Sequence, residues 1–266
     1  MVLYICKMQL KDQIKHQITI NDVPKRIISL VPSQTEFLFD IGLDDCIVGI
    51  TKFCIHPKDK IKDIINIGGT KNCRLDKIES LNPDIIIANK EENTQSDIEY
   101  LQKKYTVYTS DIKTLEDNYQ MMSDIGTIFN KQNEANKIIE QIKSGIASID
   151  SSSKKKALYF IWRKPWMSIG HDTFINEMMH QLGFENIVAE KTRYPELSIE
   201  EIQNLQAPYI LLSSEPFPFK QRHIDELQEL CPMSKIIMVD GEIFSWYGSR
   251  LLHASTYFHK ELVQLL

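Results

Sequence analysis

The sequence holds few cysteines, no apolar run long enough to cross a membrane, and no excess of basic residues. Its five cysteines form no Cys-x-x-Cys pair, and their odd number argues for free buried thiols rather than a disulfide framework. The longest apolar runs, such as residues 85–88 and 236–239, have the length of strands, whereas a membrane span needs about 18 residues. We therefore expect no transmembrane segment. The net charge of -5 at pH 7 argues against nucleic-acid binding, which needs a basic face.

The motifs of the common enzyme classes are also missing. The sequence has no Gly-x-Ser-x-Gly elbow, no P-loop and no His-Glu-x-x-His pattern. We therefore expect no enzyme activity and no intrinsic cofactor. Cys54 and His56, two residues apart, are weak candidates for metal ligands. The alternative for this pair is a buried thiol beside an exposed imidazole.

The amino terminus carries no visible export signal. Its apolar stretch is short and Lys7 follows at once, whereas a secretory signal needs about 7–15 apolar residues and a cleavage site with small side chains. If the chain is complete as given, we expect it in the cytoplasm. If a signal has been removed, we expect it in the periplasm or at the cell surface.

Short apolar runs alternate with helical patterns in both halves of the chain, which is typical of α/β proteins with parallel sheets. Strands are expected at residues 26–31, 47–50, 84–88, 105–108, 157–162, 209–212 and 236–239. Helices are expected at residues 75–81, 95–104, 173–182, 222–230 and 251–265, with another after the first strand, where Ser33 and Glu36 fit a capping box.

The middle of the chain differs, because residues 114–149 have no strand signal. The apolar spacing from Ala135 to Ile146 predicts a helix of about 18 residues. The sequence thus predicts an α/β fold of two similar three-layer lobes joined by a single long interlobe helix. The expected boundaries are 1–130 for the amino-terminal lobe, 131–150 for the helix and 151–266 for the carboxyl-terminal lobe.

Four segments stand in a recognisable order along the chain. They are residues 24–36, 75–86, 183–187 and 197–202. Their order and spacing around a long central helix resemble the class III periplasmic binding proteins, the helical-backbone metal receptors of cobalamin and siderophore ABC transporters. The resemblance implies a ligand cleft between the lobes and a monomer.

The function implied by this resemblance is that of a solute-binding protein. It would deliver a metal chelate, which is a corrinoid, a haem-like compound or a siderophore, to an ABC importer. The partners are then the small-molecule ligand and, if the chain is exported, the ABC permease. The alternative is a soluble cytoplasmic protein that binds or senses a small molecule and retains the receptor fold.

In such folds the ligand lies outside the carboxyl ends of the strands, so the loops that follow strands carry the candidate site. Aromatic side chains offer flat contact area, and basic side chains match carboxylates or phosphates on a ligand. For some aromatics, Trp162 above all, the alternative is packing inside the lobe. The ligand-binding candidates are Phe53, His56, Lys90, Trp162, Trp166, Tyr194, Glu215, Trp246, Tyr247 and Arg250.

The resemblance also implies a docking role for Asp76 and Glu200. They match positions at which the family carries a surface carboxylate on each lobe that contacts arginines of the permease. A carboxylate early in a helix also favours the helix dipole, which is the alternative reason for its presence.

Overall fold

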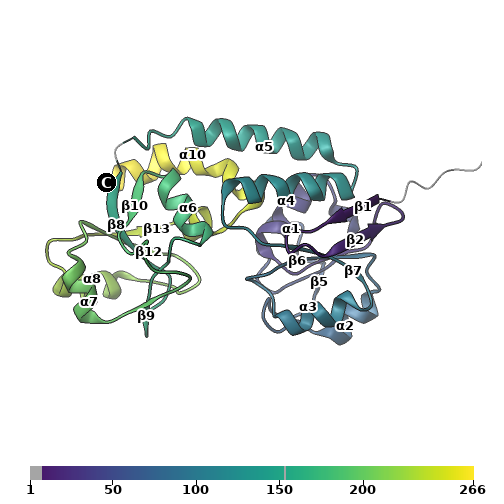
Figure 1. Cartoon of the computed structure of the whole chain (residues 1–266), viewed down its shortest axis with the longest axis horizontal. Coiled ribbons are helices and arrows are strands. Elements are labelled where there is room, and N and C mark those ends of the chain that lie inside the picture. Colours follow the sequence, from purple (N-terminus) through teal and green to yellow (C-terminus); the bar gives the residue numbers. More distant parts are fainter. Residues whose placement is uncertain (1–7, 153) are drawn as a thin grey trace, which may run out of the picture. The chain divides into compact units, whose positions relative to one another are not determined.

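The structure is a computed structural model that describes residues 8–152 and 154–266 (Figure 1). Contacts within the chain divide it into two compact units. Unit 1 comprises the residues up to Asp111 together with Glu116–Glu140 and Tyr247–Ser249. Unit 2 comprises Ile112–Leu115, Gln141–Trp246 and Arg250–Leu266. The boundaries 1–130, 131–150 and 151–266 remain a proposal.

Unit 1 is built on a five-stranded parallel sheet with the order β5-β4-β3-β6-β7. Its strands are β3 (Ile27–Ser29), β4 (Ile47–Ile50), β5 (Ile65–Asn66), β6 (Ile85–Asn89) and β7 (Thr106–Ser110). The helices are α1 (Pro32–Asp40), α2 (Leu75–Leu81), α3 (Gln95–Gln102) and α4 (Leu115–Ile128), with a 3-10 turn η1 (Asp44–Cys46). An antiparallel pair, β1 (Met8–Lys11) and β2 (Gln17–Ile20), packs beside them.

Every residue of β6 is buried, because parallel strands are covered on both faces. Figure 1 shows α2 and α3 on one side of this sheet and α1 and α4 on the other. Unit 1 therefore has the three layers expected from the sequence, and the carboxyl ends of its strands lead into the loops that hold the candidate residues.

Unit 2 is built on a four-stranded parallel sheet with the order β10-β8-β12-β13. These strands are β8 (Lys155–Phe160), β10 (Phe184–Asn186), β12 (Tyr209–Ser213) and β13 (Lys235–Val239), and β9 (Trp166–Met167) pairs separately with β11 (Glu196–Leu197). The helices are α6 (Phe174–Gln181), α7 (Ile199–Leu205), α8 (Gln221–Leu230), α9 (Gly241–Ser245) and α10 (Ala254–Tyr257). Figure 1 shows α6 and α10 on one side of the sheet and α7 and α8 on the other, so unit 2 is also three-layered.

Helix α5 (Gln132–Ala147) passes from unit 1 into unit 2. The segment Ile112–Leu115 belongs to unit 2, although the residues before and after it belong to unit 1. Likewise, Tyr247–Ser249 belongs to unit 1, although its neighbours in the sequence belong to unit 2. The α/β fold class with two parallel sheets is confirmed. None of the helices within the described ranges is both long and apolar enough to span a membrane.

One local prediction was wrong. Helix α1 begins at Pro32 with Val31 as its N-cap, so Ser33 lies inside the helix and forms no cap. Proline is tolerated at the first helical position because its missing N–H has no partner there. The helix expected at 251–265 is confirmed as an unbroken helical run, but its type changes along its length: the 3-10 helix η2 (Gly248–His253) leads into α10, the π-helix η3 (Phe258–Leu262) and α11 (Val263–Leu265).

Candidate functional site

Three of the predicted ligand-binding residues, Glu215, Trp246 and Arg250, come together in unit 2 beyond the carboxyl ends of β12 and β13. The indole Nε1 of Trp246 donates a hydrogen bond to Glu215 Oε1 at 2.7 Å. The guanidinium carbon of Arg250 lies 5.4 Å from the centre of the Trp246 ring. Trp246 is only 8 % exposed, so little of its indole is open to solvent. We call these three residues the Trp246 wall.

The Trp246 wall is held by further polar contacts. Ser245 lies 2.9 Å from the same carboxylate oxygen of Glu215, and Arg250 Nη2 lies 3.5 Å from Glu242 Oε2. Burial raises the pKa of the Glu215 carboxyl group, against the opposing effect of the hydrogen bonds from Ser245 and Trp246. The wall is therefore a preorganised group of donors and acceptors rather than a set of loose surface side chains.

A second group of side chains surrounds a pocket of about 420 Å³ in unit 2, close to the carboxyl end of β8. Beside it, the ring of Trp162 meets Phe217 edge-on at 5.4 Å, and Trp162 keeps 40 % of its surface exposed. Trp162 is therefore accessible to a ligand, and its role in binding remains a prediction. The pocket is lined by Arg163, Lys164, Phe217, Arg222, His223 and Glu226.

Arg222 and His223 were missed by the sequence analysis, because they lie on helix α8 and not in a loop after a strand. Their neighbourhood in the sequence did hold a signal. Two basic side chains follow Phe217 and Phe219 by a few residues. The other candidate ligand-binding loops carry the same mixture of aromatic and basic side chains.

Trp166 packs in the core of unit 2. It is buried, its ring stacks on Phe219 with 6.0 Å between centres, and it contacts Phe160. Its role in this structure is packing, because almost no surface remains for a ligand, and we leave it out of the proposed site. Tyr194 is half-buried, and the guanidinium carbon of Arg193 lies 5.5 Å from its ring centre.

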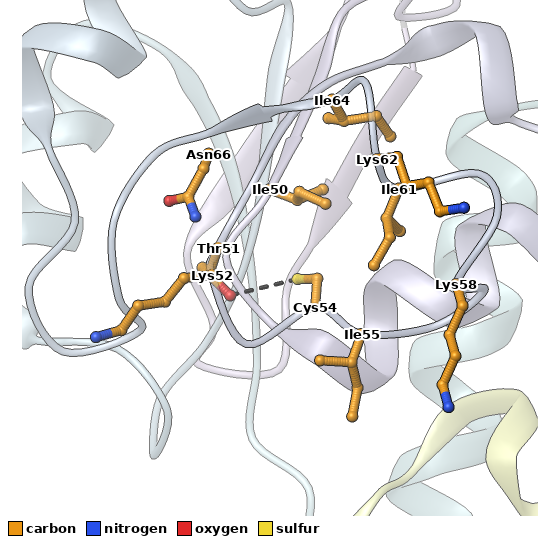
Figure 2. Close-up of a pocket in the computed structure, with 10 residues that line it drawn as sticks. All are labelled: Ile50, Thr51, Lys52, Cys54, Ile55, Lys58, Ile61, Lys62, Ile64 and Asn66. Atoms are coloured by element: carbon orange, nitrogen blue, oxygen red, sulfur yellow. Dashed lines mark hydrogen bonds between the residues drawn. The ribbon is translucent and has the colours of Figure 1, made fainter.

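In unit 1, the loop that follows β4 carries Phe53 and His56 and encloses a pocket of about 460 Å³ (Figure 2). Phe53 is exposed and His56 is half-buried. In Figure 2, Lys52 lies on one side of the pocket and Lys58 and Lys62 on the other. The rest of the lining is mostly aliphatic and comes from Ile50, Ile55, Ile61 and Ile64.

Cys54 forms part of this pocket and does not suit a metal. Its Sγ atom lies 3.1 Å from Thr35 Oγ1 and 3.3 Å from Thr51 Oγ1. Burial raises the pKa of this thiol, whereas a metal ligand must be a thiolate. Within residues 8–152 and 154–266, no group of three or more His, Cys, Asp or Glu side chains is placed to hold a metal ion. The metal hypothesis for Cys54 and His56 is therefore not supported.

Lys90 and Tyr247 lie in different surroundings in unit 1. Lys90 is exposed and its Nζ atom lies 2.6 Å from Asp111 Oδ2. Tyr247 is buried, and burial raises the pKa of its phenol well above the usual range, so the hydroxyl group stays protonated. The adjacent Gly248 N–H donates to Asn118 Oδ1 at 2.6 Å, which anchors this segment in unit 1. No sequence pattern predicts this anchor, because the two residues are 130 positions apart.

The two carboxylates expected to dock on the permease each lie in the first turn of a helix. Asp76 is in the first turn of α2 with 75 % of its side chain exposed, and Glu200 is exposed in the first turn of α7. Both carboxylates are accessible to a partner. Their docking role remains a prediction.

Comparisons with known proteins agree with this architecture. Residues 27–230 match the family model described as periplasmic binding protein. The uncharacterized ABC transporter substrate-binding lipoprotein YvrC of Bacillus subtilis is 29% identical over 212 residues, which cover 75% of this chain and 67% of that protein. The vitamin B12-binding protein of Vibrio parahaemolyticus is 28% identical over 202 residues, which cover 73% of this chain and 72% of that protein.

Among solved structures, the periplasmic vitamin B12 binding protein BtuF of Vibrio cholerae matches with a TM-score of 0.77 and 21% identity. The match covers 91% of this chain and 98% of that one, and it confirms the fold. Because the family model spans more than half of the sequence, the chain belongs to the periplasmic binding protein family.

Proposed function

We propose that this chain is the solute-binding protein of an ABC importer and that its ligand is a metal chelate. Family membership supports a small-molecule ligand and a permease partner. One relative is a substrate-binding lipoprotein of an ABC transporter and another binds vitamin B12, which favours this function over that of a cytoplasmic sensing protein. The lipoprotein relative also supports a location in the periplasm or at the cell surface.

The Trp246 wall is the structural observation that carries the proposal. It brings together an indole, a guanidinium group and a carboxylate beyond the carboxyl ends of two parallel strands, where α/β proteins bind ligands. Arg250 has five N–H donors in a planar fork, which suits carbonyl and carboxylate groups at the rim of a chelate. The accessible part of the Trp246 indole suits the apolar part of the chelate.

Titration of the natively purified protein with three chelates tests the proposal. We expect cyanocobalamin, ferric protoporphyrin or a ferric hydroxamate to quench the tryptophan fluorescence at micromolar or lower concentrations. Loss of one aromatic or charge-assisted contact costs about 1–3 kcal/mol, so Trp246→Ala and Arg250→Ala should each weaken binding roughly 5- to 150-fold.

The control for both variants is Met233→Ala, which removes a fully exposed apolar side chain of unit 2 outside the wall. This variant should bind like the wild type. Unchanged affinity in both wall variants would place the site elsewhere on the molecule. If none of the three chelates binds, the metal-chelate ligand class is wrong.

A further inference from the structure

The pocket near the end of β8 contains two N–H groups that face each other. Nδ1 of His223 accepts a hydrogen bond from the backbone N–H of Lys220 at 2.8 Å. A neutral imidazole has one proton, and this contact assigns it to Nε2. Nε2 lies 3.2 Å from Nε of Arg222, which always carries a hydrogen. Two donors therefore point at one another at hydrogen-bond distance.

Neither of these two N–H groups can accept a hydrogen bond from the other, and packing holds the His223 ring in place. His223 is only 5 % exposed, it is the third residue of α8, and its ring packs against Phe217 and Phe219. Burial, followed by the charge of Arg222, lowers the pKa of His223 and keeps the ring neutral near pH 7. An oxygen atom with negative charge between the two N–H groups would accept from both.

The charges around the pocket also favour an anion. Glu226 is engaged by Arg163, whose Nε lies 3.1 Å from Oε2 and whose Nη2 contacts Oε1. Lys164 and Arg222 line the same pocket, and neither forms a salt bridge within the part of the chain that the structure describes. The pocket therefore has a surplus of positive charge that its own carboxylate does not neutralise.

An aromatic surface continues from the pocket. Phe217 lies in the pocket wall and meets both His223 at 5.3 Å and Trp162 at 5.4 Å. Trp162 keeps an exposed surface beyond it. The combination of a small cationic pocket and a neighbouring aromatic surface suits a ligand with a flat apolar body and a short anionic arm.

We infer that this pocket receives a carboxylate arm of the ligand between Arg222 Nε and His223 Nε2, while the flat body of the ligand lies against Trp162 and Phe217. The protein then selects planar chelates that carry free carboxylates over those whose side chains are esters or amides. This inference rests on the proposed function and narrows its ligand class.

Paired ligands test the inference. Ferric protoporphyrin has two free carboxylates, and its dimethyl ester has the same ring and metal without the charges. We expect the free acid to bind the wild-type protein at least tenfold more tightly than the ester, because hydrogen bonds to a charged acceptor are about twice as strong as neutral ones.

Variants then test whether the difference in affinity between the free acid and the ester arises in this pocket. Arg222→Gln should weaken binding of the free acid roughly tenfold or more and leave the ester unchanged. Lys156→Gln removes the same charge at the amino end of β8, the opposite edge of the same sheet, and should bind both ligands like the wild type. Arg222 and Lys156 are both exposed, so neither change should disturb folding.

The possible results separate this inference from the proposed function. Equal affinity of the wild type for acid and ester would overturn the inference while leaving a chelate-binding protein. The same conclusion follows if Arg222→Gln binds the free acid like the wild type. Failure of both porphyrins, of cyanocobalamin and of the ferric hydroxamate to bind would contradict both.

Discussion

Replacing Glu215 by alanine and by glutamine should change the stability of unit 2 in different ways. The carboxylate accepts a hydrogen bond from the largely buried Trp246 indole, and alanine removes this acceptor. The loss of such a partner costs about 1–3 kcal/mol. Glutamine keeps a carbonyl oxygen as acceptor and removes only the charge. Glu215→Gln should therefore retain the hydrogen bond that Glu215→Ala loses.

The pH dependence of stability distinguishes charge from hydrogen bonding. Burial raises the folded-state pKa of Glu215 above its unfolded value, so the folded protein binds the proton more tightly than the unfolded chain does. Stability then decreases as pH rises from the unfolded pKa of about 4.3 through the folded value. At pH 7 the charge is a cost, and Glu215→Gln should be at least as stable as the wild type. This advantage should shrink below about pH 4.3.

Thermal unfolding at pH 7 and pH 4 measures both effects. Each kcal/mol corresponds to about 2–4 °C in Tm for a chain of this size, so Glu215→Ala should lower Tm by about 2–12 °C. Glu229→Gln, at an exposed position of α8, is the control and should change Tm little at either pH. The reasoning is refuted if Glu215→Gln is as unstable as Glu215→Ala, or if its difference from wild type does not depend on pH.

Three further variants test docking and packing. The double variant Asp76→Arg with Glu200→Arg should abolish uptake and leave ligand affinity unchanged. The control, Glu99→Arg with Glu229→Arg at exposed acids of the same two units, should transport normally. Normal uptake by the first double variant would contradict the docking role. Gly170→Ala should destabilise the protein by about 1–3 kcal/mol, because its Cβ would lie 2.5 Å from the backbone oxygen of Lys191 and 2.6 Å from backbone carbons of Thr192. Gly145→Ala, whose Cβ would meet only Ser255 at an ordinary 3.5 Å, should instead stabilise helix α5 by about 0.5–1 kcal/mol. Denaturant unfolding measures the change in unfolding free energy for both glycine variants. Equal changes would contradict the prediction, because they would show that the backbone around position 170 moves to accommodate the Cβ atom.

Most of the strands that the sequence predicted are buried along most of their length. β6 and β12 read as apolar runs because helices cover both faces of each sheet. The strands that it missed are short: β5, β9, β10 and β11 have two or three residues each, and β1 and β2 have four. Such strands exist only through pairing with a neighbour, and two residues are too few to show a period.

The site was predictable where it depends on the ends of strands. Glu215 and Trp246 follow β12 and β13, two adjacent parallel strands, so their proximity follows from the order of the sheet. Helix α8 was predicted as a helix, but which of its residues face a pocket depends on how it packs. The burial of Trp166 and the anchoring of Tyr247 also depend on contacts between distant parts of the chain.

The burial of the thiols has a consequence for redox chemistry. Cys54 and Cys231 are buried and Cys73 is half-buried, and burial is the first cause of a raised pKa at all three. For Cys73, with the nearby carboxylate of Asp97, the pKa rises to about 12. At pH 8 about one Cys73 in 10,000 is then a thiolate, against about a quarter of an unperturbed cysteine. Oxidants and disulfides react with the thiolate, so these thiols should survive an oxidising compartment without pairing or forming sulfenic acid.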